Sequence, residues 1–121
     1  MIQLKKLFEP IKVGEIELKN RMVFLPMVTP YGDGDRVSNR LINFWAERAK
    51  GGAGLVVCPF SPVYISHGGN PPDVTGIYED RSIPDLRRFV EAIHVYGAKA
   101  GAQLIIRDQW SRAKGAPVEF V

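Results

Sequence analysis

Two short segments near the start of the chain alternate apolar and polar residues, over 11–13 and again over 16–18. Gly14 and Glu15 separate them, and a glycine at the first of two central positions suits a type II′ turn. The pattern predicts a β-hairpin over residues 11–18 with one apolar face on each strand. Because a two-stranded ribbon is unstable alone in water, we expect the hairpin to pack against a larger body.

Three later apolar runs lack this alternation. Strands that are covered on both faces, as in parallel sheets, have such runs. They predict strands over residues 21–26, 54–58 and 98–106, and Pro26 and Pro59 are expected to stop the first two.

Apolar residues at helical spacing fill the two intervals between these strands. The first interval predicts a helix over residues 39–50, which Ser38 caps and Gly51-Gly52 ends. The second predicts a helix over residues 84–96, with Pro84 in its first turn and Gly97 at its end. Their apolar faces are formed by Leu41, Ile42, Trp45 and Ala49, and by Leu86, Phe89, Val90 and Ile93.

Alternating strands and helices predict an α/β fold with a parallel sheet and right-handed crossovers. An open doubly wound sheet would carry a G-x-G-x-x-G motif directly after a strand, whereas Gly51-Gly-Ala-Gly54 precedes one. The pattern therefore favours a partial (β/α)8 (TIM) barrel, made of an N-terminal hairpin, the first three strands and two helices. A complete barrel takes about 250 residues, and this chain has 121.

Composition and charge narrow the function classes. The net charge of +3 is spread along the chain without a dense Lys/Arg run, so no nucleic-acid partner is expected. The single cysteine, Cys58, excludes an intrachain disulfide and fits a cytoplasmic location. No membrane span, secretory signal or metal-ligand spacing is found in the sequence.

Short motifs follow one another in a fixed order from residue 7 to residue 104. They are Leu7-Phe-Glu-Pro-Ile-Lys-Val-Gly14, Leu18-Lys-Asn-Arg21, Pro26-Met27, Ala46-Glu-Arg-Ala-Lys-Gly-Gly52, Gly54-Leu-Val-Val57, Gly76-Ile-Tyr-Glu-Asp80, His94-Val-Tyr-Gly-Ala-Lys99 and Gln103-Leu104. This combination resembles the start of Old Yellow Enzyme proteins, in the enoate and 2,4-dienoyl-CoA reductase branch of the NADH:flavin oxidoreductases. The resemblance implies a barrel whose FMN passes hydride from NAD(P)H to the activated C=C bond of a small α,β-unsaturated substrate.

The same resemblance implies which residues of this chain contact the flavin. Pro26, Met27, Val28 and Thr29 would lie against the isoalloxazine ring, with backbone groups toward its N5 and O4 edge. Family members often have Thr or Cys directly after the Met, where this chain has Val28. Gln103 would bind the pyrimidine edge of the flavin, because a primary amide both donates and accepts hydrogen bonds.

Two positions depart from the family pattern. Phe60 stands where relatives usually have Ala or Gly, so its ring is expected to crowd the flavin or to replace part of its contact surface. Ile106 stands where relatives often have His. Of the other reactive side chains, Cys58 is expected to be a small buried hydrophobe, His94 to be structural or exposed, and His67 to lie in a solvated loop.

No catalytic residue is assigned within this chain, since the substrate-binding and proton-donating groups of the family lie beyond the third strand. Three interpretations remain. The chain is part of an oxidoreductase that needs another chain or a missing C-terminal part, or it is a non-catalytic structural or assembly subunit with a degenerate flavin site, or it is a self-associating half-barrel-like binding module. The retained Pro26-Met27 and Gln103 favour the first. The open edges of a three-stranded sheet predict an oligomer or a complex in each case.

Overall fold

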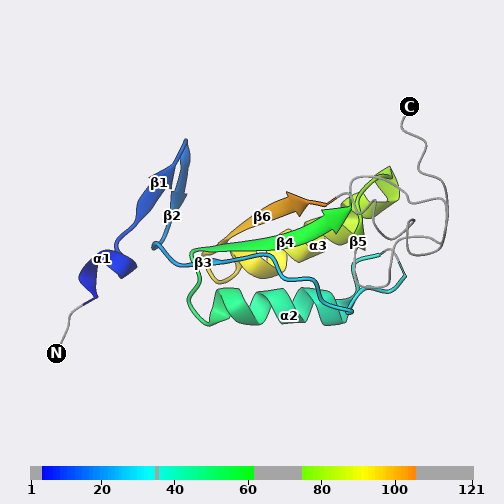
Figure 1. The fold of residues 1–121 in the computed structure, drawn as a ribbon, viewed down its shortest axis with the longest axis horizontal. Helices are drawn as coiled ribbons and strands as arrows, with labels where there is room; N and C mark the ends of the chain where they lie inside the picture. Colours follow the sequence, from blue (N-terminus) through cyan, green and yellow to red (C-terminus); the bar gives the residue numbers. More distant parts are fainter. Residues whose placement is uncertain (1–3, 35, 62–74, 106–121) are drawn as a thin grey trace, which may run out of the picture.

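The computed structural model describes residues 4–34, 36–61 and 75–105. Strands and helices alternate along the chain after a short N-terminal part (Figure 1). The elements in order are α1 (Lys5–Phe8), β1 (Ile11–Val13), β2 (Ile16–Leu18), β3 (Val23–Phe24), α2 (Asn39–Lys50), β4 (Leu55–Ser61), β5 (Thr75–Gly76), the 3-10 turn η1 (Asp80–Ser82), α3 (Ile83–His94) and β6 (Lys99–Leu104).

The hairpin of β1 and β2 lies at one end of the molecule (Figure 1). The strands are antiparallel, and Ile11 pairs with Leu18. Gly14 has a φ of 61°, a left-handed conformation that glycine adopts without steric cost and that the first central position of a type II′ turn requires. Leu18 is buried, whereas Val13 and Ile16 are more than half exposed.

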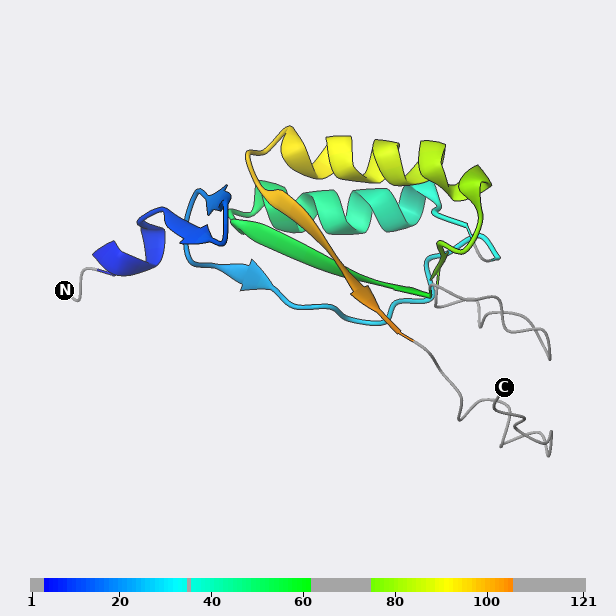
Figure 2. The ribbon, with the colours of Figure 1, turned by 90° about the horizontal axis from the view of Figure 1, so that it is seen from above.

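The main sheet is parallel, with β3 and β6 on either side of β4 and β5 paired to the end of β4. Both α2 and α3 cover the same face of this sheet and lie side by side (Figure 2). Neither helix covers the opposite face. The predicted α/β class with a parallel sheet is therefore confirmed.

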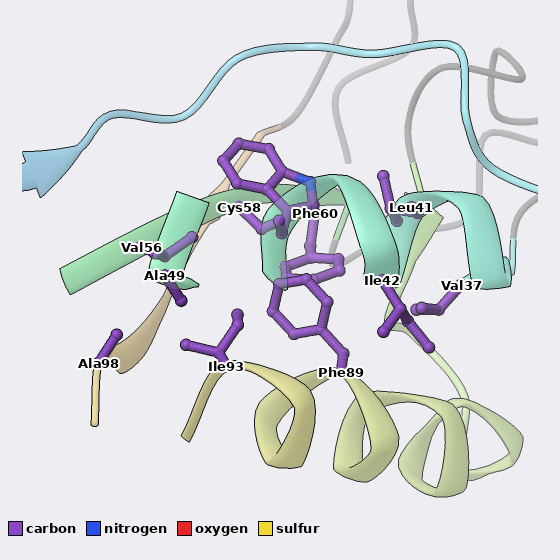
Figure 3. Packing of buried hydrophobic residues seen from close by; sticks show 11 residues of the cluster. Val37, Leu41, Ile42, Ala49, Val56, Cys58, Phe60, Phe89, Ile93 and Ala98 are labelled. Atoms are coloured by element: carbon purple, nitrogen blue, oxygen red, sulfur yellow. The ribbon is translucent and has the colours of Figure 1, made fainter. Parts of the chain in front are cut away.

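One apolar core fills the space between the sheet and the two helices (Figure 3). The Phe60 ring of β4 meets the Phe89 ring of α3 edge to face, with centroids 5.6 Å apart. Each such side chain contributes on the order of 1.5–3 kcal/mol through burial. The other fully or almost fully buried members are Leu41, Trp45, Ala49, Val56, Cys58, Ile93 and Ala98.

The linker between β2 and β3 holds the two helix C-termini together. Lys19 Nζ donates to the Tyr96 carbonyl at 2.7 Å, just after α3. Asn20 is buried, and its Nδ2 donates to the Gly52 carbonyl at 2.8 Å, just after α2. A Cβ on Gly54 would lie 2.5 Å from Asn20 Oδ1, so only glycine fits beside this amide. The Leu18-Lys-Asn-Arg21 motif therefore has a structural role at the amino ends of the strands.

All three predicted strands of the sheet differ in their bounds, and β6 is Lys99–Leu104 where residues 98–106 were expected. The first strand of the sheet is only β3, where residues 21–26 were expected, and β4 continues through Pro59 instead of ending at residue 58. The Leu55 nitrogen donates to the Met22 carbonyl, so the two-residue alternation turns the Pro59 nitrogen toward β3. Pairing with β3 has already ended at Phe24, and the missing proline donor costs no ladder bond there.

The helices lie where the sequence places them. α2 spans the predicted residues, and the Ser38 hydroxyl accepts a hydrogen bond from the Leu41 nitrogen as an N-cap does. α3 begins at Ile83 and ends at His94, two residues before the predicted end. The elements α1, β5 and η1 were not predicted, because each is too short to show a periodic pattern.

Candidate functional site

The face of the sheet away from the helices carries the candidate site. Val56, Cys58 and Phe60 of β4 point toward the helices, so the alternate residues of β4 point to the open face. A Cβ on Gly101 of β6 would lie 3.3 Å from Val57 Cγ2, which places both residues on that open face. Gln103 comes two residues after Gly101 on β6, so its side chain lies on the same side of the sheet.

The strand register pairs two residues near the carboxyl ends of the strands, and Met27 follows the end of the neighbouring strand. Pro59 pairs directly with Gln103 across β4 and β6. Val23 pairs with Leu55 across β3 and β4, and this pairing stops at Phe24. Continuing the same count into the unpaired stretch would bring Met27 level with Pro59. We call Met27, Pro59 and Gln103 the row. In parallel α/β folds, ligands bind at this end of the strands.

The row combines an apolar surface with a polar edge. Met27 is 47% exposed, and its thioether can lie against a flat ring. Gln103 is exposed, and within the described residues its amide makes no hydrogen bond, so it is able to donate and accept at once. These are the properties that a heteroaromatic ring with amide-like edges requires, and the flavin ring system has them.

Backbone donors add to the row after β3 ends. Pairing stops at Phe24, and no backbone hydrogen bond within the described ranges involves residues 25–28. Within the described residues, the N–H groups of Met27 and Val28 have no backbone partner, whereas Pro26 has no N–H. Thr29 is buried, and its carbonyl accepts from the Tyr31 nitrogen at 2.8 Å.

Phe60 does not lie where the sequence-based expectation put its ring. Its side chain is 3% exposed and packs on Phe89 in the core beneath the helices (Figure 3). Strand alternation explains this, because Phe60 has the same parity as Val56 and Cys58. The ring therefore lies on the helix-facing side of β4. Pro59 has the opposite parity on β4, is itself buried, and was not singled out by the sequence analysis.

The remaining candidates lie elsewhere. Cys58 is buried in the core, and burial raises the pKa of its thiol well above the ordinary value, so it stays protonated and unreactive. His94 is exposed at the end of α3, which leads into the amino end of β6, away from the carboxyl ends of the strands. His67 and Ile106 lie outside the described residues.

A set of contacts behind Met27 was also missed by the sequence analysis. The Ser38 hydroxyl donates to the Tyr31 carbonyl. The guanidinium of Arg40 lies 4.1 Å from the centroid of the Tyr31 ring, and the Phe44 ring meets the same ring edge to face at 5.2 Å. The only advance signal was the helical spacing of Arg40 and Phe44 on α2, which places them on one side of the helix.

An ion pair joins the same loop to α3. Arg36 Nη2 lies 2.7 Å from Asp85 Oδ2, and Arg36 Nε donates to the same oxygen at 3.1 Å. Asp85 is in the first turn of α3, where a carboxylate is also stabilised by the helix dipole. Its side chain is 13% exposed, so the pair is more shielded from solvent than a surface pair.

The fold is a parallel α/β sheet, and its candidate site lies at the carboxyl ends of the strands. This places the chain among the α/β proteins that bind ligands at that end of the sheet. The family model described as NADH:flavin oxidoreductase / NADH oxidase family matches residues 6–115. The chain belongs to this family, and the resemblance to Old Yellow Enzyme proteins is confirmed.

Curated relatives support the assignment. The chain is 41% identical over 98 residues to a metal reductase of Desulforamulus reducens, which covers 81% of this chain and 14% of that protein. It is 35% identical over 104 residues to an NADPH dehydrogenase of Listeria monocytogenes, which covers 84% of this chain and 30% of that protein. The chain thus spans less than a third of the length of these relatives.

Solved structures of the family superpose on the same region. Old Yellow Enzyme from Pichia sp. AKU4542 matches with a TM-score of 0.74 and 28% identity, over 93% of this chain and 30% of that one. A 2-naphthoyl-CoA reductase complex matches with a TM-score of 0.73 and 30% identity, over 84% of this chain and 16% of that one.

In the part of the chain that the structure describes, no helix is long and apolar enough to cross a membrane. The same residues contain no group of His, Cys, Asp and Glu side chains placed to hold a metal ion.

Proposed function

We propose that this chain forms the first three strands of a (β/α)8 barrel and one side of the flavin site of an FMN-dependent oxidoreductase. The observation that supports the proposal is that Gln103, paired with Pro59, and Met27, just after β3, are both exposed near the carboxyl ends of the parallel strands. Family membership supports flavin as the ligand. FMN, when bound, supplies the transfer of a hydride from NAD(P)H to an activated C=C bond.

The residues of this chain bind and orient the flavin. Met27 packs against the ring, the N–H groups of Met27 and Val28 donate toward its N5 and O4 edge, and Gln103 pairs with its pyrimidine edge. Pro26 and Thr29 fix the ends of the stretch that carries these donors. Phe60 supports β4 from the core and does not touch the ring.

Catalysis needs groups that this chain does not supply. β6 pairs only with β4 among the described strands, so none of them occupies its outer edge, where a further strand could pair. We propose that another chain, or a further part of a longer one, completes the barrel there and brings the substrate-binding and proton-donating residues. The whole protein is then a cytoplasmic enzyme that reduces an α,β-unsaturated substrate of the enoate or enoyl-CoA type. The similarity to a 2-naphthoyl-CoA reductase supports that substrate class.

The experiment combines native mass spectrometry with a visible spectrum of the purified chain and of whatever copurifies with it. A yellow species that contains FMN is expected, and its mass shows whether a second chain or a second copy is present. Gln103→Leu should weaken FMN binding about fivefold, the value of one neutral hydrogen bond. Asn43→Leu, an exposed amide on α2, is the matched control and should leave binding unchanged.

A colourless homo-oligomer that does not take up added FMN would overturn the proposal. That result would favour a non-catalytic structural or assembly subunit with a degenerate flavin site, or a self-associating module. The placement of Phe60 in the core removes one reason for this alternative, because its ring leaves the open face clear.

A further inference from the structure

The stretch that carries Met27 is not held by the sheet. β3 pairs with β4 only at Val23 and Phe24, and residues 25–28 make no backbone hydrogen bond within the described ranges. An unpaired extended segment has considerable conformational freedom, and fixing each residue costs on the order of 1–2 kcal/mol. The row Met27–Pro59–Gln103 needs Met27 at a defined level, so contacts outside the sheet must set its position.

Tyr31 makes the contacts that do this. Its nitrogen donates to the Thr29 carbonyl at 2.8 Å, which closes a tight turn at the end of the stretch. Its carbonyl accepts from the Ser38 hydroxyl. Its ring contacts the Arg40 guanidinium, 4.1 Å from the ring centroid, and the Phe44 ring, edge to face at 5.2 Å. One residue thus joins the stretch to α2 by backbone and by side chain.

The helix that receives these contacts is rigidly placed. Trp45 and Ala49 of α2 are fully buried against the sheet, and Trp45 stacks edge to face on Phe24 of β3 with centroids 5.3 Å apart. Ser38 also caps the helix through the Leu41 nitrogen, so its hydroxyl serves both elements. The contacts thus run from the sheet to α2 and from α2 to Tyr31, which joins the helix to the stretch after β3.

We propose that Tyr31 is a positioning residue that fixes residues 25–29 and so sets the flavin-facing geometry of Met27. The role toward flavin rests on the proposed function, whereas the role toward the stretch does not. Tyr31 acts through its ring and its backbone, and the contacts assigned to it do not involve the phenol oxygen. The conservative Tyr31→Phe variant therefore retains the function.

The first measurement needs no flavin. Backbone ¹⁵N order parameters of Met27, Val28 and Thr29 in the full chain should be near 0.85 in the wild type and should fall below about 0.6 in Tyr31→Leu. Tyr31→Phe should match the wild type. Tyr96→Leu, which removes a partly exposed tyrosine at the other end of the molecule, is the matched control. Unchanged order parameters in a folded Tyr31→Leu chain would overturn the proposal.

The second measurement is FMN affinity and the visible spectrum of the bound flavin, in the chain or in the complex that it forms. Tyr31→Leu should weaken binding roughly tenfold, because a cation–π contact and an aromatic pair are lost. It should also shift the flavin bands, which a change in global stability alone would not do. If Tyr31→Leu fails to fold, Arg40→Gln removes the guanidinium from the ring and should produce smaller changes in the same direction.

The two measurements separate the two hypotheses. A wild-type chain that binds no FMN, alone or in its complex, overturns the proposed function and the flavin role of Tyr31, while the order parameters still decide whether Tyr31 fixes the stretch. A wild type that binds FMN, with a Tyr31→Leu variant of equal affinity and spectrum, overturns the positioning role alone.

Discussion

The two faces of the sheet differ in how far side chains of this chain cover them. The helix-facing side is filled by side chains of this chain, with Val56 and Cys58 almost fully buried. The opposite side leaves Val23, Leu25 and Met27 between 43% and 69% exposed. Residues that alternate along one strand thus serve two purposes, stability on one face and binding on the other. The stability and the ligand contacts of this chain can therefore be altered separately.

The two faces should differ most in how far truncating one of their side chains lowers the free energy of unfolding. Phe89→Ala should lower the free energy of unfolding by about 3–5 kcal/mol, because it removes a buried ring and leaves a cavity beside Phe60. Leu25→Ala, a truncation on the open face, should change it by less than about 1 kcal/mol. Urea titrations of both variants test this, and equal losses would show that the open face is also covered in solution.

Thiol labelling compares neighbouring positions on the two faces. Cys58 should react with a thiol reagent only when the chain opens, because it is buried and its raised pKa keeps it protonated. The single-cysteine variant Val57→Cys with Cys58→Ala should react at least about a hundredfold faster. Stopped-flow labelling at neutral pH gives both rates. Comparable rates would place Val57 under cover and contradict the open face.

Alkaline pH should lower the free energy of unfolding, because the Cys58 thiol is buried on the helix-facing side. The pKa of Cys58 is raised in the folded state, so above the ordinary value of about 8.5 the unfolded chain loses this proton and the native chain keeps it. The contribution of the thiol to the free energy of unfolding is fully present below that pH and declines above it by about 1.4 kcal/mol per pH unit. Unfolding curves from pH 8 upward, compared with Cys58→Ala, isolate it, and identical slopes would contradict the buried thiol.

The smallest stability effect is expected at the row itself. Gln103→Leu should change the free energy of unfolding of the flavin-free chain by less than about 0.5 kcal/mol, because the exposed amide makes no hydrogen bond within the described residues. Thermal unfolding without flavin measures it. A loss above about 1 kcal/mol would reveal a structural role and remove Gln103 from the binding face.

Local signals predicted the helices well. Ser38, the Gly51-Gly52 pair and the apolar face that includes Trp45 define α2 without knowledge of the tertiary structure. Strand ends were predicted less well, because a strand ends where its neighbour stops pairing. β3 ends at Phe24 for that reason, although the apolar run continues to Leu25.

The side of the sheet on which Phe60 lies could not be read from the sequence. Phe60 has the same parity as Val56 and Cys58, but Leu55 and Val57 of the other parity are also apolar, so alternation did not show which side faces the helices. Tyr31 gave no signal either. Its importance depends on Ser38 and on the α2 side chains Arg40 and Phe44, which come together only after the chain folds back from β3 to α2.

The linker of Lys19 and Asn20 has a consequence for the order of folding during synthesis. Asn20 binds the Gly52 carbonyl, so this contact can form only after the turn that follows α2 has left the ribosome. Lys19 binds the Tyr96 carbonyl, and its contact can form only after α3 has also emerged. These two adjacent residues therefore become able to make their contacts at different stages of synthesis from the N-terminus.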